Sequence, residues 1–368
     1  MARVRWIPVP DRAGGRLQPT PARAAHLRTR SLFGVVAGVV AMQVVLMAFS
    51  TGVHRDWEPI EKDGAGGDTV TQRWYYEGIA ESHYSRSGAR MTGNAYLPDR
   101  PVGVVLGDSY VEARQLPDQS TIGSVLERAA RRGGVELNVR QYGFSGASSA
   151  RYAVIGPDVL HRWNPPFVVV VLTDDDFMGG APFVGEFTLA MRPDSTVIAR
   201  HVAPHRTATV TRLRNAAAAL LESITLADKL VVRTTRLLEG AASAPVGTPG
   251  AGPDREAEAV YASVRALRDA YDDRVAIIYV PDIAAVAADD RDRNEARVLA
   301  ACRSLGARCM SAGVALRADR NANLRLSRGF ANSAPAAGHL NAVGASIVAG
   351  VAWSAVRPLV ERGTPPRP

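Results

Sequence analysis

A serine, a histidine and a glycine occupy positions in this chain that acyl-transfer chemistry would require. Ser109 directly follows the short apolar run VGVVLG and an aspartate, and a serine hydroxyl becomes a nucleophile when a base takes its proton. His339 in the segment GHLNAVG is the candidate base. The backbone N–H groups of Ser109 and Gly146 are candidate donors to an oxyanion, because a residue without Cβ lets a substrate approach the chain closely.

Each of these residues also has a structural interpretation. Serine and aspartate are preferred at helix starts, so Ser109 is also a candidate helix cap. His339 also fits a hydrogen-bonded loop histidine, and Gly146 also fits a plain turn glycine. The acidic run Asp174, Asp175 and Asp176 supplies hard oxygens of the kind that bind Mg²⁺ or Ca²⁺, but adjacent side chains point in different directions. We therefore interpret that run as a solvated loop or helix start and expect no metal.

Apolar runs of strand length alternate with segments of helical spacing from residue 102 onward. The expected strands are 102–107, 135–143, 165–173, 274–281 and 307–313, and the expected helices are 119–134, 148–163, 294–306 and 342–356. Continuously apolar runs indicate strands that are buried on both faces. Strands that alternate with helices form a parallel sheet covered on both sides. The sequence therefore predicts a three-layer α/β/α domain.

The candidate residues lie where these strands end. Three strand ends carry GDSY, YGFSGAS and LTDDDF, and GHLNAVG comes just before the last helix. Ligands of open parallel sheets bind beyond the carboxyl ends of the strands. We therefore expect Ser109, Gly146, Asp175 and His339 to converge on one rim.

This ordered set resembles the SGNH hydrolase superfamily, also called GDSL-type esterases. Gly107-Asp108-Ser109 matches the family's first block, Ser145-Gly146 the second, residues 173–176 the third, and His339-Leu340-Asn341 with Gly344 the last. The resemblance covers roughly residues 100–357 and implies a flavodoxin-like α/β fold with a parallel sheet. It also implies a Ser109–His339 ester hydrolase or acyltransferase that uses no metal or organic cofactor.

Two positions depart from the family pattern. The family's oxyanion-donating asparagine falls on Asp175, and an ionised carboxylate cannot donate. Losing one such donor costs about 2.7–4 kcal/mol of transition-state stabilisation. The acid that precedes the family's histidine by three residues falls on Ala336, which leaves open which acid, if any, orients His339.

The N-terminal segment predicts a membrane anchor. Residues 32–49 carry no charge, and 18 residues at ~1.5 Å each span roughly 27 Å, enough to cross the hydrocarbon layer. Seven arginines and a single acid precede this run and would keep the N-terminus cytoplasmic. A cleaved signal peptide is the alternative, although its apolar core is usually ~7–15 residues long. We expect a single-pass inner-membrane protein whose main domain is periplasmic.

The charge distribution and the cysteines limit which partners and which covalent links are expected. The first thirty residues account for six of the chain's eight net positive charges, so the rest is nearly neutral and nucleic-acid binding is not expected. The only cysteines, Cys302 and Cys309, either close a disulfide in an oxidising compartment or stay as two independent thiols.

The chain divides by composition into five expected parts: a basic tail (1–30), a transmembrane helix (31–50), a linker with an irregular extension (51–100), an SGNH-like domain (101–358) with an insertion (177–255), and a tail (359–368). The insertion is expected to contain a long amphipathic helix near 208–239.

The motifs indicate two functions, and the departures at Asp175 and Ala336 motivate the second of them. One is an esterase that acts on an ester substrate, with O-acyl groups of envelope glycans as an example. The other is a catalytically degenerate fold that serves as an accessory subunit of a large inner-membrane complex, such as a bioenergetic one.

Overall fold

The computed structural model divides the chain into two units, residues 1–50 with 212–242 and residues 51–211 with 243–368. The residues that the structure describes are 34–35, 37–38, 41, 70–74, 77–85, 88–177, 187–192, 196–201, 253–282, 286–287, 292–333, 336 and 338–363. The predicted membrane span lies outside them, except for five residues that are helical and exposed: Gly34, Val35, Ala37, Gly38 and Ala41. The predicted helix near 208–239 also lies outside them. All that follows concerns the second unit.

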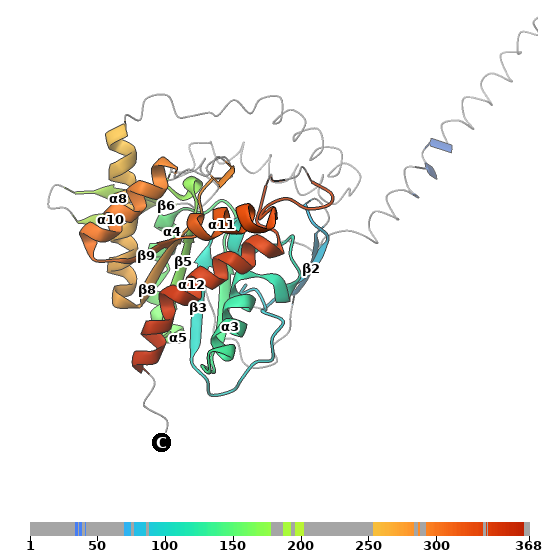
Figure 1. Cartoon of the computed structure of the whole chain (residues 1–368), viewed down its shortest axis with the longest axis horizontal. Helices are drawn as coiled ribbons and strands as arrows, with labels where there is room; N and C mark the ends of the chain where they lie inside the picture. The colour runs from blue at the N-terminus through green and yellow to red at the C-terminus, as the bar shows by residue number, and fades with distance from the viewer. Residues whose placement is uncertain are drawn as a thin grey trace, which may run out of the picture. The chain divides into compact units, whose positions relative to one another are not determined.

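Five parallel strands form the sheet of this unit (Figure 1). They are β3 (Val102–Gly107), β4 (Asn138–Gly143), β5 (Val168–Leu172), β8 (Val275–Tyr279) and β9 (Arg308–Ser311), in the spatial order β4-β3-β5-β8-β9. Counted along the chain, this is the order 2-1-3-4-5 of flavodoxin-like folds. Every residue of β3, β4, β5 and β8 is buried, which confirms the burial expected from the continuous apolar runs. The predicted α/β class and parallel sheet are thus confirmed.

Helices cover both faces of the sheet. On one face α3 (Ile122–Arg132) and α12 (Ala342–Gly363) lie side by side (Figure 1). Their apolar side chains join those of the sheet in one core. The opposite core is formed with α4 (Ser149–Val154), α5 (Gly156–Trp163), α8 (Pro253–Tyr271) and α10 (Arg293–Leu305). The other helical elements of this unit are α2 (Ser109–Glu112), η1 (Asp118–Ser120), η2 (Asp174–Asp176), η3 (Asp272–Arg274) and α11 (Gly313–Asn323).

Some helix boundaries differ from the sequence prediction. The closing helix expected over 342–356 continues to Gly363 as α12 and so enters the predicted tail. The single helix expected over 148–163 is two helices, α4 and α5, which meet at Ile155. Pro157 stands in the first turn of α5, where its missing N–H is tolerated, whereas inside a continuous helix the proline would remove a hydrogen bond and clash with the preceding turn.

Among the described residues, one helix is long and apolar enough to cross a membrane by length and composition, Ala342–Arg362 in α12. Its mean hydropathy is 1.5, and 44% of its most apolar window is buried. Residues such as Val348, Ala352 and Val356 pack in the core beside α3 and the sheet. Its apolar composition is therefore explained by its place in the core.

The N-terminal extension is more regular than the sequence indicates. Strands β1 (Val70–Trp74) and β2 (Ala80–Tyr84) form an antiparallel hairpin. The buried guanidinium of Arg90, just after the hairpin, donates from Nε to Asp118 Oδ1 at 3.0 Å and from its other nitrogens to three backbone carbonyls between residues 112 and 116. Asp118 also accepts from the backbone N–H of His83 in β2 at 3.1 Å. The hairpin is therefore fixed to the segment that follows α2.

Part of the predicted insertion forms a second hairpin. Strands β6 (Phe187–Met191) and β7 (Val197–His201) pair antiparallel in a sheet of their own and pack against α4 and α8. The remainder of residues 177–255 that precedes α8 lies outside the described residues, apart from Phe177 after η2 and single positions at the hairpin ends.

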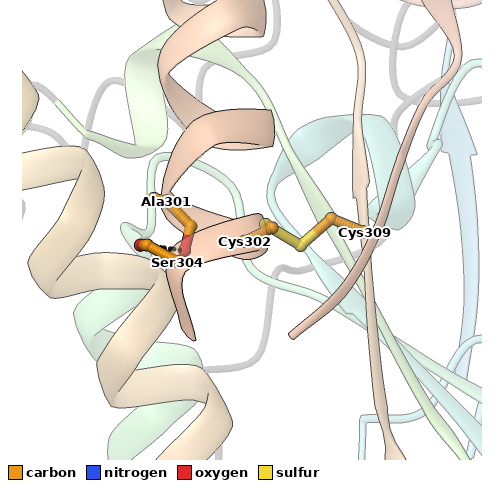
Figure 2. The surroundings of a disulfide bond; sticks show 4 residues. All are labelled: Ala301, Cys302, Ser304 and Cys309. Carbon is orange, nitrogen blue, oxygen red and sulfur yellow. Dashed lines mark hydrogen bonds between the residues drawn. A yellow bond between two sulfur atoms is a disulfide. The ribbon is translucent and has the colours of Figure 1, made fainter. Parts of the chain in front are cut away.

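The two cysteines form a disulfide. Cys302 near the end of α10 is bonded to Cys309 in β9, with the Cα atoms 6.0 Å apart (Figure 2). The bond joins the last turn of a helix to the edge strand that follows it, and Cys302 is buried. Of the two alternatives left open by the sequence, the structure has the bridge.

Candidate active site

The nucleophile candidate begins a four-residue helix at the end of β3. Asp108 caps this helix by accepting from Tyr110 N at 2.8 Å, so Ser109 is the first helical residue and not the cap. The helix lies directly against the end of β4. The contact is so close that a side chain at Gly143 would overlap the backbone of Glu112. The strand end and the packed helix together fix the position of the Ser109 hydroxyl.

His339 lies within hydrogen-bond distance of Ser109. Its Nε2 is 2.9 Å from Ser109 Oγ, although the two residues are 230 positions apart in sequence. The rings of His339 and Tyr110 are 5.3 Å apart at 49°. The predicted convergence of hydroxyl and imidazole is therefore present, with both groups half-buried.

The other ring nitrogen of His339 contacts an acid that the sequence did not reveal. Glu77, in the connection between β1 and β2, places Oε2 2.5 Å from His339 Nδ1 and accepts from the His339 backbone N–H through Oε1 at 2.7 Å. A carboxylate can only accept, so the ring proton of a neutral His339 lies on Nδ1 and Nε2 is left to accept from Ser109. Glu77 is buried and supplies the carboxylate that Ala336 lacks.

The approach of Glu77 depends on a glycine. Gly338 has a φ of +74°, and a Cβ there would overlap the Glu77 carboxylate. Glu77 had no recognisable sequence signal, because it lies 262 positions from His339 within an aromatic and polar run. Its place beside the ring follows only from the packing of the hairpin.

An amide clamp holds the Glu77 connection in place. Asn332 Oδ1 accepts from Gly78 N at 2.7 Å, and Asn332 Nδ2 donates to Gly78 O at 3.0 Å. Asn332 belongs to the loop that leads to His339, so the clamp joins the two segments that carry the acid and the base.

Replacing Asn332 by alanine is expected to lower kcat for ester hydrolysis about tenfold, because the loss of two hydrogen bonds of about 0.5–1.5 kcal/mol each lets the Glu77 connection move. The measurement is steady-state kinetics beside a urea melt. A purely structural role would lower the melt midpoint and leave kcat per folded molecule unchanged. N332D, which keeps the acceptor for Gly78 N, should recover part of kcat.

A buried arginine supports the same loop. Arg328 donates to the Tyr110 hydroxyl and to Pro281 O at 2.7 Å, and its guanidinium stands 4.9 Å from the centre of the Tyr110 ring. Burial raises the pKa of Tyr110 to about 12, against the opposing effect of the Arg328 charge. Tyr110 is therefore neutral at ordinary pH and packs beside His339 as an apolar wall.

The remaining predicted residues lie at the same carboxyl-terminal edge. Gly146 is exposed in the turn after β4 and has a φ of +72°. Its neighbour Ser145 donates to the buried carboxylate of Glu112 in α2. Asp175 is exposed after β5, and its charge contributes to raising the pKa values of Asp108 and Tyr110. β3 and β5 flank the position where the strand order reverses, which is where such sheets bind ligands.

The neighbours of Asp175 have structural partners. Asp174 accepts from Tyr279 and from Asn294 Nδ2 at 3.0 Å, and burial raises its pKa. Asp176 is buried and accepts from Thr173 N at 2.6 Å and from Tyr152 Oη at 2.9 Å. Within the described residues, no group of three or more His, Cys, Asp or Glu side chains is placed to hold a metal ion.

Asp108 carries a pH dependence that can be tested. Burial raises its pKa to about 6, partly offset by the Tyr110 N–H and the nearby His339. Because this pKa is higher in the folded state than in the unfolded state, the protonated Asp108 stabilises the fold below about pH 4. That contribution to the free energy of unfolding is lost as the pH rises through about 6. D108N keeps the capping oxygen but cannot ionise. The wild type should therefore lose up to about 3 kcal/mol relative to D108N between pH 4 and 7. Urea unfolding at several pH values measures this, and a constant difference between the two proteins would contradict it.

No family model and no curated protein sequence matches this chain. Among solved structures, the chain is similar to TesA with 12% identity and a TM-score of 0.37, covering 70% of this chain and 99% of TesA. It is similar to a Clostridium thermocellum family 3 carbohydrate esterase with 10% identity and a TM-score of 0.39, covering 73% and 100% of the two chains. For the acetyl xylan esterase AlAXEase the identity is 13%, the TM-score 0.38, and the coverage 69% and 99%.

Two of these matched structures are esterases by name, the carbohydrate esterase and the acetyl xylan esterase. Because every one of these TM-scores is below 0.5, the function proposed below rests on the geometry of the site.

Proposed function

We propose that this chain is a serine esterase or acyltransferase whose reactive group is Ser109. The observation that carries the proposal is the continuous relay from Ser109 Oγ through the His339 ring to Glu77, with contacts of 2.9 Å and 2.5 Å. A hydroxyl, an imidazole and a carboxylate in this sequence of contacts form the arrangement that activates a serine for attack on an acyl carbon.

The reaction proceeds in two steps. Ser109 Oγ attacks the ester carbonyl carbon while its proton passes to His339 Nε2, and Glu77 stabilises the resulting imidazolium. The backbone N–H groups of Ser109 and Gly146 donate to the oxyanion, and the alcohol leaves with the proton from His339. Water, or an acceptor hydroxyl in a transferase, then attacks the acyl-serine with His339 as base, which releases the acyl group and restores Ser109.

Asp175 limits the expected rate. At the position where the resembled family has an oxyanion-donating asparagine, an ionised carboxylate repels the developing negative charge. The missing donor alone is worth about 2.7–4 kcal/mol, or roughly 10²–10³ in kcat. The proposed enzyme is therefore slow on simple esters.

The proposal includes a location. Residues 31–50 anchor the chain in the inner membrane with the N-terminus in the cytoplasm and the α/β unit in the periplasm, where O-acyl groups of envelope glycans are candidate ester substrates. The Cys302–Cys309 disulfide supports an oxidising compartment.

A second function is favoured by Asp175 alone. A fold that has lost its oxyanion donor could serve as an accessory subunit of a large inner-membrane complex, such as a bioenergetic one. The lack of an acid three residues before His339 does not favour this second function, because Glu77 takes that role in the geometry.

Covalent labelling tests the proposal. The full chain in mild detergent is incubated with a fluorophosphonate probe, in which the activated serine displaces fluoride from phosphorus. We expect one adduct per chain on the peptide that contains Ser109, together with slow turnover of p-nitrophenyl acetate. An unlabelled folded protein that co-purifies with a large complex would instead establish the accessory role.

A further inference from the structure

A cavity of about 200 Å³ lies beside the β6–β7 hairpin, and part of its wall comes from two loops that also carry residues of the candidate active site. Its wall is formed by the start of α4, the residues at and after the end of η2, strand β6, and one face of α8. The hairpin belongs to the insertion that interrupts the α/β repeat, so this cavity is a feature added to the sheet and its helices.

The cavity begins where two loops of the candidate site end. Asp176 in the wall accepts from Thr173 Oγ1 at 3.0 Å, and the same hydroxyl lies 3.5 Å from the carboxylate of Asp108, the residue before Ser109. On the other loop, the wall residue Ser148 follows Gly146 by two positions. Two loops of the candidate site therefore also supply residues to the wall of this cavity.

The polar side chains of the wall are already paired within the protein. Ser149 Oγ lies 2.8 Å from Ser263 Oγ, which donates to Ala259 O at 2.8 Å. Ser148 donates to Phe187 O at 3.4 Å, and Asp176 accepts from Tyr152 at 2.9 Å.

What the wall presents to an occupant is therefore mostly apolar. Its apolar residues include Phe177, Phe187 and Leu189, together with Ala259 and Ala262 of α8. A polar occupant would lose its hydration without gaining a partner, whereas an apolar one gains contact with these side chains.

We propose that this cavity receives the apolar group of the ester substrate, an aliphatic or aromatic group of about six to eight carbons. An apolar cavity of about 150 Å³ holds benzene, so one somewhat larger suits a group of this size. The inference rests on the proposed function, and it names the substrate class as an ester with a medium-length apolar group on its acyl or alcohol side.

The first test varies the substrate on the full chain. In the acyl arm, kcat/KM is compared for p-nitrophenyl acetate and hexanoate, and in the alcohol arm for ethyl acetate and hexyl acetate. We expect a gain of at least about tenfold in one arm, because each added methylene leaves water on binding. The arm that responds identifies the side of the ester that the cavity holds.

The second test fills the cavity from α8. A259L extends a side chain into it, and A257L adds the same atoms on the exposed part of the same helix as a control. A259L should lower kcat/KM for the preferred six-carbon ester at least about tenfold while acetate stays within about twofold, and A257L should leave both unchanged. If A259L fails to fold, F187A provides the converse test, since a larger cavity should move the optimum to longer esters.

The outcomes separate the two proposals. Absence of Ser109-dependent hydrolysis of every ester would remove the proposed function. Hydrolysis with no chain-length preference in either arm, or with equal effects of A259L on short and long esters, would overturn the cavity assignment and leave the proposed function in place.

Discussion

Replacing Ser109 by alanine is expected to abolish ester hydrolysis, with a fall in kcat of roughly 10⁴-fold or more. The hydroxyl is the atom that forms the acyl bond, and the candidate relay ends on it at 2.9 Å from His339 Nε2. Without it, the remaining groups can only orient a water molecule less effectively. The assay is release of p-nitrophenol by the detergent-solubilised chain.

The variant should fold normally, because the cap of α2 is made by Asp108 and not by Ser109. S145A is a useful comparison, since it removes a serine hydroxyl of the same rim that bonds to Glu112 and lies outside the relay. Equal turnover in the wild type and S109A would show that any hydrolysis comes from another group, and the proposed function would be abandoned.

Replacing Glu77 by glutamine is expected to lower kcat by roughly 10³–10⁴-fold. The carboxylate accepts the Nδ1 proton and stabilises the imidazolium that forms when Ser109 is deprotonated. A glutamine amide can donate to Nδ1 instead, which favours the tautomer with its proton on Nε2 and removes the acceptor for the serine hydroxyl. KM should change much less than kcat, because Glu77 faces the histidine.

The chain supplies a matched control for this variant. Glu81 lies on the same hairpin but is exposed and pairs with Arg73 at 2.8 Å, so E81Q changes the same charge without touching the relay. E77D tests the distance between the carboxylate and His339 Nδ1. The aspartate side chain keeps the charge but is one methylene shorter, so the variant should retain only part of the activity. If E77Q and E81Q were equally active, His339 would be oriented by something other than Glu77.

The strands were predictable because their physical cause is local. VVVVL in β5 and VAIIY in β8 are uninterrupted apolar runs. Such a run predicts a strand that is buried on both faces, whatever the arrangement of distant segments. The break between α4 and α5 was missed although its cause, Gly156-Pro157, stands in the sequence, because the apolar spacing continues across it.

The positions of Ser109 and His339 could be predicted for a similar reason. Ser109 directly follows a strand and His339 comes just before a helix, and in a parallel sheet covered by helices the strand ends and the helix starts share one edge. The position of Glu77 does not follow from such a rule. Its hairpin is held against the sheet by the buried residues Arg90 and Asp118, and no periodicity in the sequence predicts that these two residues pair.

The sequence by itself determined the α/β class, the parallel strands and the pairing of a hydroxyl with an imidazole, since periodicity and strand ends act over short stretches of chain. Only the tertiary structure decided which acid completes the relay, whether the cysteines are joined, and that a cavity lies beside Asp176. These features depend on contacts between segments far apart in sequence, and such contacts form only when the whole unit packs.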